Sequence, residues 1–180
     1  MSTIDLIVLG LVKQKPQSAY DIQKELERRN IFQCVRVSVP SIYKKTIQLE
    51  EKGYIEGSII KEGKMPEKSI YRLTGQGEEY FLALMAHISG QSVNIFLDFN
   101  AVIINLDSVP LEIKKKCLNQ IEMNILALKE MINENIMSKP YIPMTGKSVL
   151  EQQFSLAENL ECWIEKLKSR YEYLEANGEE

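Results

Sequence analysis

The sequence predicts a mainly α-helical protein with one small β-hairpin, and three observations lead to this prediction. Apolar residues recur at helical spacing over most of the 180 residues. Residues 54–74 instead combine β-branched and aromatic residues around a central turn, which is typical of a hairpin. Breakers at Pro110 and between Pro140 and Gly146 divide the second half into helices of ordinary length.

Two capping signals mark the first helices. The nearly continuous apolar run 4–12 follows Ser2 and Asp5, whose capping-box spacing favours a helix over a buried strand. Ser18 and Asp21 repeat that spacing and open a second helix that extends to about residue 30. Residues 31–37 are expected to form a short connector with some strand character.

The stretch 38–53 predicts a short helix with signals at both ends. Ser38 suits the cap, Pro40 suits the first turn, and Gly53 suits the left-handed residue that ends a helix. One face is apolar, and the other presents hydroxyl, aromatic and cationic groups, as a DNA-reading helix does. A merely solvated helix gives the same pattern. The expected DNA-contacting residues of this helix are Ser41, Tyr43, Lys44, Lys45 and Gln48, although Tyr43 also suits a core position.

Residues 54–61 and 69–74 are expected to be the two strands of the hairpin, with a charged turn between them. Three helices followed by a hairpin is the element order of a winged helix-turn-helix. In that fold the short third helix enters the major groove of DNA and the hairpin tip reaches neighbouring phosphates. Lys64 and Lys68 are therefore expected to contact phosphate.

The second half is expected to be wholly helical. Helices are predicted over 75–86, over 92–106 as a buried helix apolar nearly all round, over 111–137, and over 148–176. The last helix carries an apolar stripe that needs a partner, either another helix of this chain or a second copy. We expect a DNA-binding domain at 1–86 and an α-helical dimerisation domain at 87–180. The expected dimerisation residues are Leu150, Phe154, Leu160, Trp163, Ile164, Leu167, Tyr171 and Leu174.

Composition excludes several classes of protein. No apolar run is long enough to span a membrane, and no secretion signal is visible at the start of the chain. Three widely spaced cysteines are typical of reduced thiols in a cytoplasm. No catalytic or cofactor-binding motif is present, so we expect neither an enzyme nor a bound cofactor. The net charge of −3 divides into a basic first half, with 13 Lys/Arg and 11 Asp/Glu in residues 1–85, and an acidic second half.

The chain has one tryptophan, Trp163, and one histidine, His87. Trp163 suits an anchor packed at the dimer interface better than a stacking platform for a planar effector. His87 has no second histidine or paired cysteine at ligand spacing, so no metal site is expected. A role for His87 as a pH sensor rests only on its presence.

Several short motifs resemble the PadR family of bacterial transcriptional regulators. Residues 41–43 (Ser-Ile-Tyr) and 49–55 (Leu-Glu-Glu-Lys-Gly-Tyr-Ile) are similar to the family's Ser-Leu-Tyr and Leu-Glu-x-x-Gly-Leu-Ile signatures. Residues 71–77 (Tyr-Arg-Leu-Thr-Gly-Gln-Gly) resemble its strand-to-helix signature. Residues 7–11 and 20–22 are similar to its first two helices.

The resemblance implies a winged-helix domain followed by an α-helical dimerisation domain, and ligand-tuned repression. We therefore expect a cytoplasmic homodimer that represses transcription at a near-palindromic site on double-stranded DNA and responds to a small-molecule effector. The chain departs from the family at Ser18 and Ala19, where His-Gly is usual, at Lys44, where Pro is usual, and at Glu67, where Arg is common. These departures and the acidic balance support an alternative, a winged-helix module that binds proteins without specific DNA binding.

Overall fold

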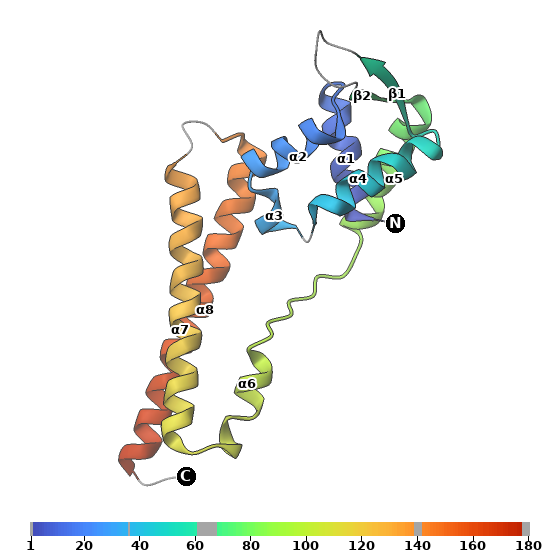
Figure 1. Ribbon diagram of the computed structural model, residues 1–180. Helices are drawn as coiled ribbons and strands as arrows, with labels where there is room; N and C mark the ends of the chain where they lie inside the picture. Colours follow the sequence, from blue (N-terminus) through green and yellow to red (C-terminus); the bar gives the residue numbers. More distant parts are fainter. Residues whose placement is uncertain (1, 36, 61–67, 139–141, 178–180) are drawn as a thin grey trace. The chain divides into compact units, whose positions relative to one another are not determined.

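The computed structural model of this protein describes residues 2–35, 37–60, 68–138 and 142–177 (Figure 1). The chain divides into two compact units, Met1–Val93 and Asn94–Glu180. The boundary expected from sequence, 86/87, falls inside a helix that continues to Ser89. None of the helices in the described ranges combines the length and apolarity that a membrane crossing requires.

The first unit is a helical bundle followed by a two-stranded hairpin, as the sequence predicts (Figure 1). The mainly helical fold class with a single hairpin is thereby confirmed. Its elements are α1 (Thr3–Gln14), α2 (Ala19–Arg28), α3 (Ile31–Cys34), α4 (Val39–Glu51), β1 (Ile55–Ile60), β2 (Lys68–Leu73) and α5 (Gly75–Ser89).

Helix α1 lies at the centre of this unit because its apolar run is buried on several sides. It contacts α2, α4, α5 and β2. Val8 and Leu9 are fully buried, and together with the inward faces of the surrounding elements they form one continuous core. The other buried members of that core are Leu11, Val12, Ile22, Leu26, Ile42, Leu49, Ile55, Tyr71 and Leu84.

Some of the helix caps predicted from the sequence are present in the structure, and one is not. Ser18 and Asp21 form the expected capping box, and the Ser18 hydroxyl is the main cause that lowers the pKa of Asp21. Gly53 has φ 72°, in the left-handed region that ends α4 as expected. The capping box expected at Ser2 and Asp5 is wrong, because Ser2 makes no side-chain cap hydrogen bond and Asp5 turns inward.

The hairpin is antiparallel and pairs Ile55 with Leu73 at its base and Ile60 with Lys68 at its outer end. Gln17, before α2, forms an isolated bridge to Tyr71, with backbone hydrogen bonds of 3.2 and 3.1 Å. This bridge fixes the base of the hairpin to the α1–α2 turn. The hairpin turn, with Lys64 and Glu67, lies outside the described residues.

The connector after α2 differs from its predicted strand character. Asn30 adopts a left-handed conformation (φ 55°), which ends α2, and the chain then forms the four-residue helix α3. Ile31 and Phe32 pack against the core of the unit. Their apolar and aromatic character suits this packing as well as it suits a strand.

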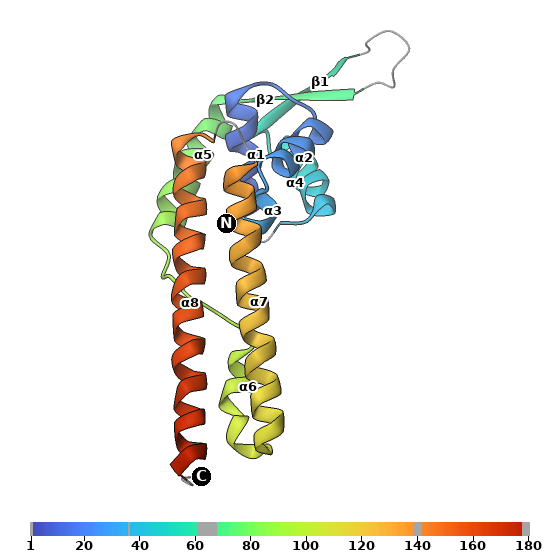
Figure 2. The same cartoon turned by 90° about the vertical axis from the view of Figure 1, so that its left-hand side faces the viewer.

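The second unit is built on two long antiparallel helices, which lie side by side in both views (Figures 1 and 2). Helix α7 spans Leu111–Met137, and α8 spans Met144–Asn177, starting earlier than the predicted 148. They are preceded by the short helix α6 (Asn100–Ile104) and a 3₁₀ turn, η1 (Leu106–Ser108). Two ion pairs join the long helices, Lys129 to Glu161 at 2.5 Å and Lys168 to Glu122 at 2.6 Å.

The predicted buried helix over 92–106 is wrong. Residues 92–97 form neither helix nor strand, and Val93 and Phe96 are 90% and 87% exposed. A helix that is apolar all round is stable only where neighbours cover every face, and within the described chain this segment has no such cover. Only its later residues pack inward: Leu106 is 1% exposed in the α7–α8 core that includes Ile164, and Phe99 and Ile103 pack against that core.

Candidate nucleic-acid interface

Helix α4 has one face in the core and the opposite face in solvent. Ile42 and Leu49 are 0% and 2% exposed, and between them Thr46 donates its hydroxyl to the Ile42 carbonyl at 2.9 Å. Since successive residues turn by about 100° around a helix, the residues opposite this face are those offset by about half a turn. The outward residues are Pro40, Lys44, Ile47 and Glu51, all of them exposed.

Ser41 is half-buried and its hydroxyl belongs to the start of α4. The hydroxyl accepts a hydrogen bond from the Ser38 amide at 3.1 Å and donates to the Ser38 carbonyl at 2.6 Å. These bonds satisfy backbone groups that the first turn leaves without helical partners. Ser41 thus holds the entry to α4 in place.

Tyr43 lies on the side of α4 that faces α2. Its hydroxyl donates to Oε1 of Gln23 at 3.2 Å, and its side chain is 38% exposed. Tyr43 is therefore outside the core, and its hydroxyl links α4 to α2.

Lys45 points towards α1. Its Nζ lies 3.1 Å from Oδ1 of Asp5, whose side chain is only 7% exposed. The other carboxylate oxygen of Asp5 accepts the Tyr80 hydroxyl at 3.2 Å, and burial followed by the charge of Asp5 raises the pKa of that phenol. Tyr80 in turn stacks on Tyr54, with ring centroids 4.2 Å apart. One carboxylate thus connects α1, α4 and α5, and a phosphate contact by Lys45 has to compete with it.

Of the remaining predicted contacts, Lys44 and Lys68 lie at the surface. Lys44 is exposed on the outward face of α4, Gln48 is half-buried beside it, and Lys68 is exposed at the start of β2. Lys68 is close enough to Asp21 at the start of α2 for its charge to contribute to the lowered pKa of that carboxyl. Lys64 lies outside the described residues.

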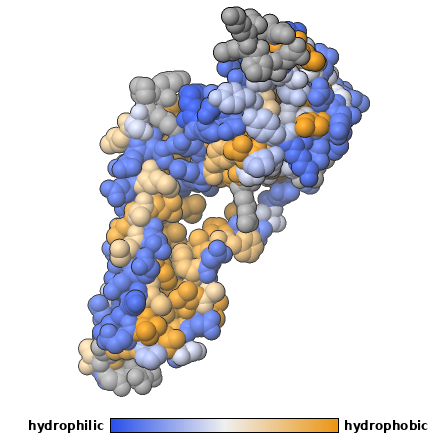
Figure 3. All heavy atoms as spheres, in the orientation of Figure 1, coloured by the Kyte–Doolittle hydropathy of each residue, from blue (hydrophilic) through white to orange (hydrophobic). Residues whose placement is uncertain are grey.

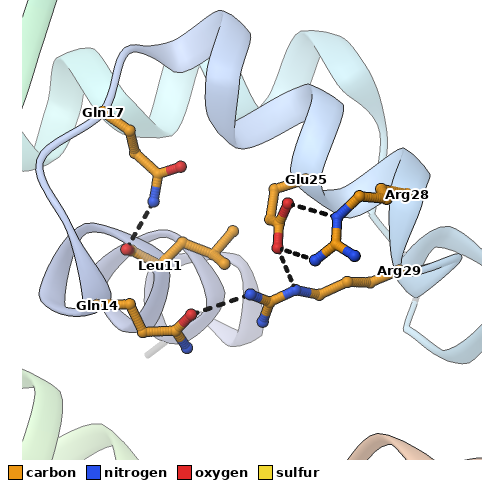
Figure 4. A network of polar contacts seen from close by, with 6 residues as sticks. All are labelled: Leu11, Gln14, Gln17, Glu25, Arg28 and Arg29. Atoms are coloured by element: carbon orange, nitrogen blue, oxygen red, sulfur yellow. Dashed lines mark hydrogen bonds and ion pairs between the residues drawn. The ribbon is translucent and has the colours of Figure 1, made fainter. Parts of the chain in front are cut away.

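A polar network holds α2 against α1 and thereby fixes the support on which α4 rests (Figure 4). Glu25 accepts hydrogen bonds from Arg28 and Arg29, and Arg29 also donates to Gln14 of α1 at 3.0 Å. The two guanidinium groups, Arg28 first, lower the pKa of Glu25 to about 2. Gln17 is buried close by and donates to the Leu11 carbonyl at 2.6 Å.

Sequence reasoning missed Asp5, Gln23 and Tyr80 as residues that position α4. Each acts across the fold, so no spacing along the chain identifies it. Ile47 was also missed, although its exposure could have been read from its place opposite Ile42 and Leu49 on the helix. In the described part of the chain, no group of three or more His, Cys, Asp or Glu residues could hold a metal ion.

A sequence profile described as the "Transcriptional regulator PadR-like family" matches residues 8–83, which include α4 and the hairpin. Residues 8–83, within the first unit, are thus similar to the PadR-like family. The family resemblance of the motifs in residues 41–43, 49–55 and 71–77 is thereby confirmed. No curated protein matches the chain in a sequence search.

Solved structures share the fold of this chain. Bacillus subtilis PadR in complex with operator DNA matches with a TM-score of 0.80 and 18% identity, covering 94% of this chain and 99% of that one. A PadR-like transcriptional regulator from Bacillus cereus matches with a TM-score of 0.71 and 23% identity, covering 97% and 99%. The Vibrio cholerae virulence activator AphA matches with a TM-score of 0.71 and 14% identity, covering 96% and 99%. At these identities the matches establish the fold.

The predicted dimerisation residues are mostly packed inside the second unit. Ile164 is fully buried and Leu150 is 8% exposed, both against α7. Trp163 is half-buried and stacks on Phe99, with ring centroids 5.7 Å apart. Most of the apolar stripe on α8 is thus buried against other helices of the same chain. Phe154, Leu160, Leu167 and Tyr171 are half-buried in the same clusters, and Leu174 is 37% exposed.

Proposed function

We propose that this PadR-like protein is a DNA-binding transcriptional regulator that acts as a homodimer and represses at a near-palindromic operator. The observation that carries the proposal is α4, which the winged-helix unit presents with Lys44 and Ile47 outward and its other face in the core. Its length, Val39–Glu51, suits the major groove, which is about 12 Å wide.

The charges of the first unit support contact with the DNA backbone. Lys44 on α4 and Lys68 on β2 are exposed cations on the two elements that a winged helix brings to DNA. Gln48, half-buried beside Lys44, adds a side chain that can donate and accept hydrogen bonds. Bacillus subtilis PadR, which shares this fold, was solved on its operator DNA.

Exposed apolar side chains of the second unit and the segment before it support the homodimer. Since α8 buries much of its stripe against α7, the surface left for a second copy lies elsewhere. Figure 3 shows hydrophobic residues gathered over one face of this unit. Large exposed apolar patches typically mark interaction sites, and most oligomers of one chain are symmetric dimers. The most exposed of these side chains are Val93, Phe96, Met144, Ile104, Met137, Tyr173, Ile95 and Met123.

A small-molecule effector completes the proposal. Its support is the solved complex of Bacillus subtilis PadR with p-coumaric acid, a protein of the same fold at 18% identity. In this chain a cavity of about 230 Å³ opens between α7 and α8, lined by Lys115, Leu118, Asn119, Lys168, Tyr171 and Glu172. Lys115 and Lys168 lie beside the Tyr171 ring and suit a small organic anion, which would have to compete with Glu122 for Lys168 and to avoid the Glu172 carboxylate. Such an anion should raise the melting temperature of the protein if it binds the folded state.

The test of the proposal is fluorescence anisotropy with duplexes from the protein's own promoter region and a scrambled duplex, at several salt concentrations. A preference for the promoter that persists as salt rises shows that bases or DNA shape are read. Equal, weak binding to both duplexes that disappears with salt would contradict the proposal. It would instead favour a winged-helix module that binds proteins.

A further inference from the structure

The polar side chains near the start of α4 are largely engaged inside the protein, which limits what can read a base. The Ser41 hydroxyl bonds to Ser38, the Tyr43 hydroxyl bonds to Gln23, and the Lys45 ammonium pairs with Asp5. What α4 offers outward along its middle is different in character. It is a lysine, Lys44, followed by an isoleucine, Ile47.

Ile47 is the large apolar side chain at the centre of that outward face. It is 53% exposed, whereas Ile42 and Leu49 of the same helix are 0% and 2% exposed. A single exposed apolar residue is ordinary on a protein surface. Ile47 differs in its position, one turn after Lys44 and one turn before Glu51, on the face that the proposed function directs into the major groove. A β-branched residue also contributes little to helix propensity at such a site.

We propose that Ile47 is a base-reading residue whose side chain packs against the 5-methyl group of a thymine in the major groove. This inference rests on the proposed function and adds sequence specificity to it. Of the four bases, thymine alone presents a methyl group in the major groove. Guanine and adenine present acceptors there, and adenine and cytosine present amino donors, and an isoleucine would desolvate these groups without offering a hydrogen bond. Ile47 therefore favours thymine over each of the other bases at one position in each half-site.

Lys44 and Ile47 are spaced to contact neighbouring base pairs. Three residues of helix rise about 4.5 Å, close to the 3.4 Å between successive base pairs. Lys44 is long and mobile enough to reach either a phosphate or a guanine. Ile47 then prefers a thymine at one base pair, and Lys44 contacts the phosphate or a guanine at the neighbouring base pair.

The experiment substitutes each thymine of the bound promoter duplex by uracil, one at a time, and measures affinity by anisotropy at fixed salt. Uracil lacks only the methyl group, so pairing and charge are unchanged. Loss of one buried methyl should weaken binding of the unmodified protein about fourfold at the thymine that Ile47 contacts. Ile47→Ala should bind the unmodified duplex more weakly and should show no further loss at that position.

Lys44→Ala is the matched control on the same face. It should weaken binding to every duplex and reduce the dependence on salt, while the uracil penalty stays in place. If Ile47→Ala gives the same uracil profile as the unmodified protein, the inference is wrong although DNA binding stands. If the unmodified protein prefers no duplex at all, the proposed function itself fails. If Ile47→Ala leaves DNA affinity unchanged but alters self-association, Ile47 belongs to a protein contact and the inference is also wrong.

Discussion

The Nζ of Lys45 lies 3.1 Å from Oδ1 of Asp5, so a lysine of α4 is held by a nearly buried carboxylate of α1. Lys44, its neighbour in the chain, is exposed on the outward face instead. Two adjacent lysines of the same helix therefore have different physical roles. One orients α4 within the winged-helix unit, and the other is available to a ligand of that helix.

This difference predicts that two alanine substitutions destabilise the protein to unequal extents. Lys45→Ala leaves the Asp5 carboxylate buried with only the Tyr80 hydroxyl, so the free energy of unfolding should fall by about 1–3 kcal/mol. Lys44→Ala removes an exposed side chain and should change it by no more than about 0.5 kcal/mol. Urea denaturation of both variants measures this. Equal stability of the two variants would show that the Asp5 ion pair contributes nothing.

The pairing of Lys45 could not be predicted from the sequence, whereas the helix that carries it could. Ser38, Pro40 and Gly53 are local signals, and they place both ends of α4 within two residues of the observed bounds. The partner of Lys45 depends on how α1 packs on α4, which no local pattern contains. Asp5 even carries a misleading signal, because its spacing from Ser2 is that of a capping box.

The burial of the segment 92–106 also could not be predicted from the sequence. Its apolar residues predicted a buried helix, since a continuous hydrophobic run normally has neighbours on every side. Whether such neighbours exist is a property of the assembled chain. In the structure α6 has only five residues and Phe96 is exposed. A continuous apolar run in the sequence is therefore compatible with an exposed apolar surface as well as with a buried core.

The Glu25 cluster predicts a dependence of stability on pH. Arg28 and Arg29 lower the pKa of Glu25 from its ordinary 4.5 to about 2. A lowered pKa in the folded state gives stability that is present above about pH 4.5 and is lost as the pH falls towards 2. Glu25→Gln should therefore cost about 1 kcal/mol at neutral pH, because Arg28 is exposed and screened by solvent.

The measurement is urea denaturation of Glu25→Gln and the unmodified protein at a series of pH values. The difference between them should narrow as the pH falls below about 4.5. Glu27→Gln is the control on the same helix, since Glu27 is 39% exposed, accepts from Lys24 and Gln23 without a guanidinium partner among the described contacts, and should show a smaller difference. A difference for Glu25→Gln that stays constant with pH would contradict the assignment.

Two glycines near the start of α5 should respond differently to alanine. A Cβ on Gly77 would lie 1.9 Å from the Tyr54 carbonyl oxygen and 2.8 Å from Cδ1 of Leu73. Since backbone has to move to relieve this overlap, Gly77→Ala should lower the free energy of unfolding by about 1–3 kcal/mol. A Cβ on Gly75 would meet no described atom within 4 Å. Gly75→Ala should be neutral or stabilise by up to about 1 kcal/mol, and thermal denaturation separates the two.

The exposed and buried apolar residues of the second unit should separate dimerisation from folding. Phe96 is 87% exposed, so its burial requires a partner, and Phe96→Ser should raise the dimer dissociation constant tenfold or more in sedimentation equilibrium. Ile164 is fully buried against α7, and Ile164→Val should lower the free energy of unfolding by about 0.5–1.5 kcal/mol with little change in that constant. If Phe96→Ser dimerises as tightly as the unmodified protein while Ile164→Val does not, the interface lies on the α8 stripe. The exposed segment would then need another explanation.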